Sequence, residues 1–423
     1  MADYFNGVIG YEDIKKELNI IIDMMNNTQM YEDMGASLEK GIILEGNPGT
    51  GKTTMANCLI KATDRKCFVC RKKASDGKFV DEIVKTFEEA KKNAPSIVFL
   101  DDIDKFAEKG GNDFDDNDPE EFVTIQSCID EVKDESVFII ATANKIRKLP
   151  KSLLRPGRLG KCLYVRLPKP NESEKIIEHY LSKTRMGTDL DALSISKLLY
   201  GETCATLENV IARAASKAVF NRKEAVAMGD IVSACLDLVF ESPEYDKKPS
   251  ADTLRRIAYH EAGHAVVGEL LIPGSVGIAS IRMSSSDTLG FVRYCREDDE
   301  CNTLEYYENL IKTSLAGKAA TEIVYGEADL GANNDLHSAF DRAIKIADDY
   351  CTYGFSNWIE DDTTSFSGEN RNRTMALIME QQYQATKKLL IDNREILDAM
   401  ADALIEKTTL VYSDIQKLVM GKE

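Results

Sequence analysis

The hydrophobic positions in the first part of the chain fall in short continuous runs. Residues 41–45, 96–100 and 137–142 are almost entirely apolar, and each run ends at a glycine or at polar residues. Runs of this length without alternation are typical of strands buried on both faces of a parallel sheet. We therefore predict an α/β domain in which a parallel sheet is flanked by helices.

The second part of the chain has mostly helical spacing. One apolar-periodic stretch, residues 254–271, follows Pro249 and Ser250 and is stopped by Pro273 and Gly274. Residues 277–283 and 289–294 alternate like two paired strands. Further helices are expected at 315–325, 335–350 and within 375–419. This pattern predicts a mainly α-helical second domain, and the polar segment 243–250 predicts a linker before it.

A phosphate-binding loop follows the first predicted strand. Its glycines let backbone N–H groups turn toward phosphates, and the helix that begins behind it adds a partial positive charge. Lys52 is expected to reach the β- and γ-phosphates of ATP, and Thr53 to ligate Mg²⁺. The predicted nucleotide-binding residues of this segment are Gly46, Asn47, Pro48, Gly49, Thr50, Gly51, Lys52, Thr53 and Thr54.

Two acidic residues end the strand at 96–100. Asp101 is predicted to hold the water shell of the magnesium ion, and Asp102 to polarise the attacking water. Asn144, after the strand at 137–142, is placed to sense the γ-phosphate. Arg155 and Arg158 follow, and we predict that they complete the nucleotide site of a neighbouring subunit.

The helix at 254–271 contains His260, Glu261 and His264. Residues four apart share one face of a helix, so both imidazoles can bind one metal ion. Zinc suits neutral imidazoles, and a catalytic zinc keeps one coordination position open for water. Glu261 is predicted to be the general base that activates this water. Two histidines alone are one protein ligand short of a catalytic zinc site. The spacing in the sequence leaves five candidates for the third ligand: Glu322, Asp329, Asp335, His337 and Asp341.

Composition narrows the classes of function. The 53 basic and 71 acidic residues give a net charge of −18, which argues against a broad nucleic-acid surface. We see no apolar run of membrane-spanning length and no signal peptide, so we expect a soluble, cytoplasmic protein without a transmembrane anchor. Ten scattered cysteines fit a reducing compartment, and Cys67 and Cys70 are interpreted as packing thiols.

Together these motifs, in this order, make the chain resemble the FtsH-type family of ATP-dependent zinc metalloproteases. Residues 4–242 are similar to an AAA+ ATPase module, and the resemblance extends over nearly all of the 423 residues. It implies that Ile9 and Gly10 line an adenine pocket and that His179 lies on the nucleotide side of a helical lid. It also implies that residues 201–205 form the second sensor, and that the chain assembles into a hexameric ring.

The resemblance also selects among the candidate metal ligands. The family's aspartate ligand lies in a G-A-x-N-D segment, which matches residues 331–335 here, so Asp335 is the expected third ligand. Glu322 is the second choice and is expected to orient an imidazole instead. His337 should point elsewhere.

Two segments depart from the family's pattern. Asp102 stands where the family usually has glutamate, so we expect slower ATP hydrolysis. Residues 71–80 are shorter than the family's substrate-threading loop and lack its aromatic–hydrophobic–glycine tripeptide. Phe79 could substitute for that aromatic residue, although its spacing with Val80, Ile83 and Phe87 slightly favours packing at a helix start.

The predicted protein is an AAA+ ATPase ring that feeds protein substrates to a zinc endopeptidase, with ATP, Mg²⁺ and Zn²⁺ as cofactors. One alternative is an ATP-independent peptidase whose ATPase module is a scaffold or switch. Another is a remodelling or binding protein with a vestigial peptidase. The predicted parts are a nucleotide-binding subdomain (1–167), a helical lid (168–242), a linker (243–250) and the peptidase (251–423).

Overall fold

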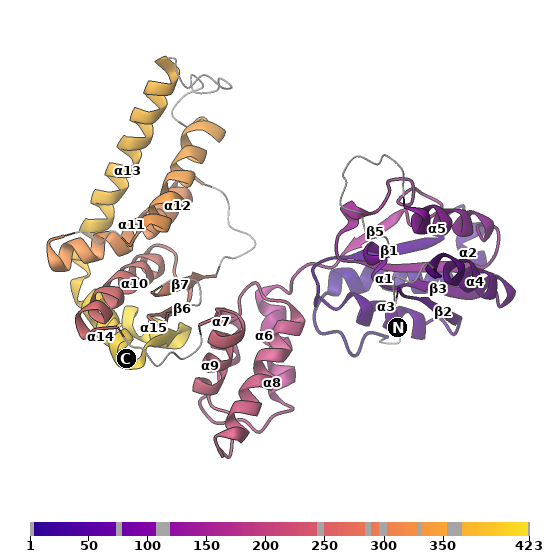
Figure 1. The fold of residues 1–423 in the computed structure, drawn as a ribbon, viewed down its shortest axis with the longest axis horizontal. Helices are drawn as coiled ribbons and strands as arrows, with labels where there is room; N and C mark the ends of the chain where they lie inside the picture. Colours follow the sequence, from indigo (N-terminus) through magenta and orange to yellow (C-terminus); the bar gives the residue numbers. More distant parts are fainter. Residues whose placement is uncertain are drawn as a thin grey trace. The chain divides into compact units, whose positions relative to one another are not determined.

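The parallel sheet predicted from the apolar runs is present in the computed structural model (Figure 1). The structure describes residues 4–72, 78–106, 119–242, 249–283, 289–295, 303–327, 331–352 and 366–421. In the last range, the side chains of residues 366–371 are not described. Its five strands are all parallel and run in the order β2-β3-β4-β1-β5. They are β1 (Gly41–Glu45), β2 (Lys66–Cys70), β3 (Ser96–Leu100), β4 (Val137–Ala143) and β5 (Lys161–Tyr164). The α/β prediction for this part is confirmed.

Helices cover both faces of this sheet because alternate strand residues point to opposite sides. On one face Ile43 and Val98 pack with α4 (Phe79–Lys92) and α5 (Glu120–Glu131). On the other face Ile42 and Phe99 pack with α1 (Glu12–Asn26) and α3 (Lys52–Lys61). A short helix, α2 (Thr28–Asp33), follows α1. The two hydrophobic clusters fix the carboxyl ends of the strands, where the nucleotide motifs lie.

The chain divides into two compact units. Residues 1–179 with 201–209 form the first, and residues 180–200 with 210–423 form the second. The segment after the sheet carries α6 (Pro170–Leu181), α7 (Ala192–Leu198), α8 (Cys204–Phe220) and α9 (Met228–Leu238). The domain boundaries expected at residues 167, 242 and 250 stay predictions.

The second unit is mainly helical, as predicted. Its central helix, α10 (Ala251–Leu271), begins where Ser250 Oγ accepts a hydrogen bond from the Thr253 N–H. The other elements are α11 (Leu304–Tyr325), α12 (Asn333–Ile344), a π turn (Lys345–Asp349), α13 (Phe366–Asp392), α14 (Arg394–Lys407) and α15 (Tyr412–Val419), with strands β6 (Val276–Ser280), β7 (Phe291–Tyr294) and β8 (Thr409–Val411).

The strand pair predicted at 277–283 and 289–294 is confirmed as β6 and β7, which are antiparallel. β8 pairs with the other side of β6, so β7 is an edge strand. Buried residues of α10, α11 and α14 form the core beneath this sheet. Within the ranges described above, no helix combines the length and the apolar composition needed to cross a lipid bilayer.

Candidate metal centre and nucleotide site

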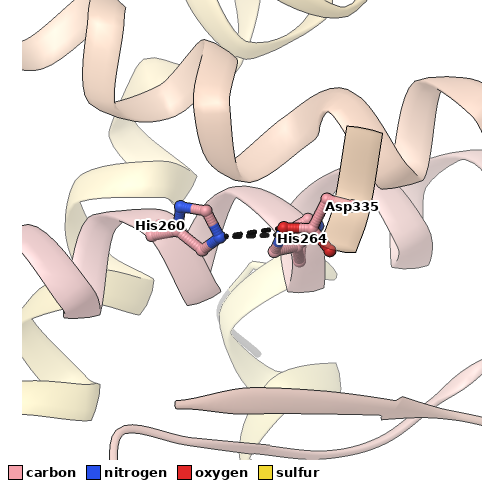
Figure 2. A group of neighbouring side chains, drawn as sticks. All are labelled: His260, His264 and Asp335. Carbon is pink, nitrogen blue, oxygen red and sulfur yellow. Dashed lines mark hydrogen bonds and ion pairs between the residues drawn. The ribbon is translucent and has the colours of Figure 1, made fainter. Parts of the chain in front are cut away.

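His260 and His264 lie one turn apart on α10, and Asp335 lies in the first turn of α12 (Figure 2). The His260 Nε2 and His264 Nε2 atoms are 3.2 Å apart, and each is 3.2 Å from Asp335 Oδ2. Three ligand atoms thus form an equilateral triangle. Ligands about 2.0 Å from a tetrahedral zinc ion are about 3.3 Å from one another, so the three residues fit zinc.

The imidazole of His264 is held in the tautomer that a metal needs. Its Nδ1–H donates to the backbone carbonyl oxygen of Thr313 at 2.8 Å. A carbonyl oxygen only accepts, so a proton lies on Nδ1, and Nε2 is the nitrogen left to bind a metal ion. Glu322, expected to orient an imidazole, instead accepts hydrogen bonds from Tyr383 and Lys387.

The charged groups of this site strongly perturb one another. Burial lowers the pKa of His264, but the neighbouring Asp335 carboxylate outweighs it and raises the pKa to about 9. Burial raises the pKa of Asp335, but the hydrogen bonds from His260 and His264 bring it far below its usual range. Burial raises the pKa of Glu261, although the two histidines oppose this rise. Such perturbed groups are typical of catalytic sites.

Glu261 is buried and lines a cavity of about 560 Å³ together with His260, His264 and Asp335. Two glycines that the sequence analysis did not single out shape this cavity. A Cβ at Gly290, just before β7, would lie 2.7 Å from Glu261 Oε1. A Cβ at Gly317, on α11, would lie 2.5 Å from both His260 Nε2 and His264 Nε2. An isolated glycine inside a helical pattern is the signal that could have indicated Gly317.

The phosphate-binding loop lies between β1 and α3, as predicted. Lys52 Nζ donates to the carbonyl oxygens of Gly46 and Asn47, both at 2.8 Å, and to Asn144 Oδ1 at 2.9 Å. Burial lowers the pKa of Lys52, and the carboxylate of Asp102 opposes this shift. The structure thus brings together the lysine of the loop, the predicted sensor and the second acid.

The predicted second-sensor turn packs on the same loop. Gly49 has φ +81°, which favours glycine, and a Cβ there would lie 2.8 Å from Thr203 Oγ1. The Ala205 N–H donates to the Gly49 carbonyl oxygen at 3.1 Å. The loop residues Asn47, Pro48, Gly49 and Thr54 are exposed, Gly51 and Thr53 are half-buried, and Gly46, Thr50 and Lys52 are buried.

Asp101 is buried at the end of β3. Its Oδ1 accepts hydrogen bonds from Thr53 Oγ1 at 3.2 Å and from Thr142 Oγ1 at 2.8 Å. Its other oxygen forms an ion pair with Arg71, whose side chain is 55% exposed. Cys70 and Leu100 are partners in the parallel pairing of β2 and β3, so the residues that follow them, Arg71 and Asp101, are neighbours. No local pattern in the sequence predicts this pairing, because Arg71 and Asp101 are 30 residues apart in the chain.

Asp102 faces the same edge of the sheet. Lys105 Nζ lies 2.8 Å from Asp102 Oδ2, and Asn144 Nδ2 lies 3.4 Å from Asp102 Oδ1. Asp104, which the motif analysis left aside, is buried and accepts the Asn144 N–H at 3.0 Å. Asp104 therefore positions Asn144.

Arg155 and Arg158, predicted to act on a neighbouring subunit, differ in their contacts within the chain. Arg158 donates to both carboxylate oxygens of Asp130, at 3.0 and 2.6 Å, and to Gln126 Oε1 at 2.8 Å. Residues of α5 in the same chain therefore supply partners for Arg158. Arg155 is exposed. Whether either arginine acts on a neighbouring subunit stays a prediction.

The remaining nucleotide residues predicted from the resemblance lie on separate segments. Ile9 and Gly10 are half-buried, and a Cβ at Gly10 would lie 2.7 Å from Glu172 Cγ at the start of α6. His179 is exposed on α6. Their contact with adenine stays a prediction.

Phe79 begins α4 and is buried, with its ring edge-on to Phe106 at a centroid distance of 4.8 Å. This contact agrees with packing at a helix start. Residues 73–77 of the segment that corresponds to the family's threading loop, and the candidate ligand Asp329, lie outside the described residues.

Comparisons with known proteins agree with the two halves of the structure. The ATPase family associated with various cellular activities (AAA) matches residues 42–167, and Peptidase family M41 matches residues 248–418. The chain is similar to the ATP-dependent zinc metalloprotease FtsH 2 of Thermoanaerobacter sp., with 31% identity covering 98% of this chain and 82% of that protein.

It is also similar to the ATP-dependent zinc metalloprotease FtsH of Thermus thermophilus, with 30% identity covering 99% of this chain and 70% of that protein. The FtsH protein of Cupriavidus metallidurans shows 29% identity, which covers 99% of this chain and 68% of that protein. The matches run through both the nucleotide-binding and the metal-binding parts, in the same order. The resemblance seen in the sequence is thus confirmed, and the chain belongs to the FtsH family of ATP-dependent zinc metalloproteases.

Proposed function

We propose that this protein is an ATP-dependent zinc endopeptidase that cleaves protein substrates. The triangle of His260, His264 and Asp335 ligand atoms, with sides of 3.2 Å and Glu261 in the same cavity, is the observation that carries the proposal. The names of the relatives support the same activity. This set of residues is complete, which argues against a remodelling protein with a vestigial peptidase.

The chemistry at the metal centre follows from the side chains. A zinc ion held by the three ligands would supply Lewis acidity to the attacking water and to the scissile carbonyl. Glu261 would accept the proton of that water and pass it to the leaving amine. Burial raises the pKa of Glu261, which makes the carboxylate a stronger base than an exposed glutamate. Asp335 and the Thr313 carbonyl keep the imidazoles oriented.

The nucleotide site would power the delivery of substrate. Lys52 would leave the carbonyl oxygens of its own loop and bind the phosphates, and Thr53 and Asp101 would hold Mg²⁺. Asp102 and Asn144, which lie together at the same edge of the sheet, would orient the attacking water and sense the γ-phosphate. We also propose that the chain assembles into a hexameric ring with Arg155 at the subunit boundary. The domain boundaries predicted from the sequence and a cytoplasmic location are part of the same proposal.

A second candidate is an ATP-independent peptidase in which the ATPase module is a scaffold or a switch. Two observations favour it. Arg71 holds one oxygen of Asp101, the predicted magnesium residue, and Phe79, the candidate threading aromatic, is buried against Phe106.

Cleavage of a loosely folded protein by the zinc-loaded enzyme, with and without ATP, separates the two candidates. Cleavage that needs hydrolysable ATP supports the ATP-dependent protease, and equal cleavage without ATP supports the second candidate. Glu261→Gln should abolish cleavage while zinc binding and ATP hydrolysis remain. Lys52→Ala should abolish nucleotide binding while zinc binding remains. Cleavage that survives Glu261→Gln would show that another residue is the base.

A further inference from the structure

Lys105 is a cation of the nucleotide-binding unit that lies outside the phosphate-binding loop. It ends a short 3-10 turn, η1 (Ile103–Lys105), which follows Asp102 at the carboxyl end of β3. Its Nζ atom lies 2.8 Å from Asp102 Oδ2, and its side chain is 63% exposed. Lys105 is therefore a mobile positive charge at the edge of the sheet where the nucleotide motifs gather.

The backbone after β3 turns Lys105 back toward the end of the strand. Asp102 has the left-handed conformation φ 58°, ψ 48°, which is uncommon for a residue with a side chain and is often found at functional sites. The Lys105 N–H donates to the Asp102 carbonyl oxygen at 2.9 Å, which closes the turn. Side chains three residues apart in such a turn lie on the same side. The turn therefore places the ammonium group of Lys105 against the carboxylate of Asp102.

The Asp102 carboxylate connects Lys105 to the residues proposed to contact the phosphates. Its other oxygen, Oδ1, lies 3.4 Å from Asn144 Nδ2, and Asn144 Oδ1 accepts a hydrogen bond from Lys52 Nζ at 2.9 Å. Burial lowers the pKa of Lys52, and the nearby charge of Lys105 adds to this effect. Two lysines therefore lie on either side of one carboxylate and one amide, where the γ-phosphate of ATP is expected.

The ion pair between Lys105 and Asp102 is weak enough to be exchanged for another. Ion pairs with an exposed lysine contribute little to stability, because water screens them and the long side chain loses freedom. A terminal phosphate group carries about two negative charges and three acceptor oxygens, so it attracts an ammonium group more strongly than one carboxylate does. ADP has no γ-phosphate, and with ADP the pair with Asp102 should persist.

We propose that Lys105 leaves Asp102 and binds the γ-phosphate when ATP enters the site, so that it is a specificity-determining residue for ATP over ADP. The exchange also releases Asp102 Oδ2, the oxygen that Lys105 holds, only when the nucleotide carries a γ-phosphate. Asp102 would then be available to the attacking water with ATP but not with ADP. The inference rests on the nucleotide-driven function proposed above and adds a residue that recognises the nucleotide.

The test compares the dissociation constants of ATP and ADP, both with Mg²⁺, in variants of the full chain. Asp102→Asn is the common background, because asparagine keeps the shape, carries no charge and should not support hydrolysis, so that ATP itself is the probe. In this background Lys105→Met should weaken ATP binding about fivefold, the upper range for a pair made by an exposed lysine, and leave ADP binding unchanged. Lys105→Arg keeps the charge and should retain most of the preference for ATP.

The uncharged background separates direct binding of the phosphate from simple neutralisation of Asp102. If Lys105 only neutralised Asp102, Lys105→Met would weaken ATP binding in the wild type but not in Asp102→Asn protein, and the proposal would be overturned. Lys61→Met is the matched control, because Lys61 is exposed at the other end of α3, about 14 Å along the helix from Lys52. It should leave both dissociation constants unchanged, and thermal unfolding without nucleotide confirms that each variant is folded.

The remaining outcomes distinguish this inference from the proposed function on which it rests. Equal weakening of ATP and ADP binding by Lys105→Met, or no change in either, would overturn the role of Lys105 alone, provided that Lys52→Ala still abolishes binding. If the wild type binds neither nucleotide, or if Lys52→Ala binds ATP as tightly as the wild type, the assignment of the phosphate-binding loop falls as well.

Discussion

Gly317 is the position at which a single methyl group should separate folding from metal binding. A Cβ built at this residue of α11 lies 2.5 Å from His260 Nε2 and from His264 Nε2, and 2.6 Å from His260 Cε1. Carbon atoms in folded proteins essentially never come so close to their neighbours, so the imidazoles must move away. The atoms that move are those proposed to bind zinc, and they already lie at the spacing that a tetrahedral ion needs.

The expected size of the effect follows from these contacts. Disturbing the groups that orient metal ligands typically lowers metal affinity by about 10–100-fold. We expect this range for Gly317→Ala, which corresponds to about 1.4–2.7 kcal/mol. The stability of the metal-free helix should change little or even rise, because alanine is favoured over glycine in a helix interior by about 1 kcal/mol. Gly317→Ala should therefore lower zinc affinity while the stability of the metal-free protein stays the same or rises.

The assay is competition for zinc with a chromophoric chelator, together with thermal unfolding of the metal-free protein. Gly229→Ala is the matched control, because Gly229 lies in α9 and a Cβ there meets nothing within 4 Å. The control should bind zinc like the wild type. A Gly317→Ala protein with wild-type zinc affinity would refute the reasoning that this glycine makes room for the metal ligands.

Two further substitutions probe the nucleotide-binding unit. Burial raises the pKa of Glu172, but hydrogen bonds from Arg166 and from the Lys169 and Tyr11 N–H groups lower it below its usual range. Glu172→Gln should therefore cost about 1–3 kcal/mol of unfolding free energy at pH 7, and the difference from wild type should shrink as pH falls below about 4.5. A difference that is constant from pH 7 to 3 in urea unfolding would contradict this. Arg71→Ala frees one oxygen of Asp101 and should lower the Mg²⁺ concentration needed for half-maximal nucleotide binding. The decrease should be at most about fivefold, because Arg71 is half-exposed and exposed ion pairs are weak. An unchanged Mg²⁺ titration would show that the ion pair does not compete with the metal.

The parts of the site that could be predicted from the sequence are those whose residues lie close together in the chain. The phosphate loop and the pair His260 and His264 depend on spacings of a few residues, and a strand or helix converts such spacings directly into geometry. Asp335 lies 71 residues after His264, since 335 − 264 = 71, and spacing alone left five candidates for its role. Only the resemblance to the family selected it.

The contacts that the sequence did not indicate involve partners supplied by tertiary folding. Glu322 is five residues after Gly317 on α11, about 140° around the helix from the face that meets the histidines, so it bonds to Tyr383 and Lys387 instead. Arg158 finds Asp130, which lies 28 residues earlier on α5. The sequence does not indicate that position 290 must be glycine. Gly290 can lie close to Glu261 only because it has no side chain, and no local pattern marks such a contact.

The single stripe on α12 that carries Asp335, Ser338 and Arg342 has a consequence for changes in chain length. Each residue of a helix turns the chain by about 100°, so one residue inserted between Asp335 and Ser338 would rotate everything that follows out of the cavity. The buried side chains of Ala339 and Ala343 would turn out of the core at the same time. The length of this turn of α12 is therefore fixed by packing as well as by the metal centre, and a deletion or insertion here should be tolerated less than most substitutions of the exposed residues between them.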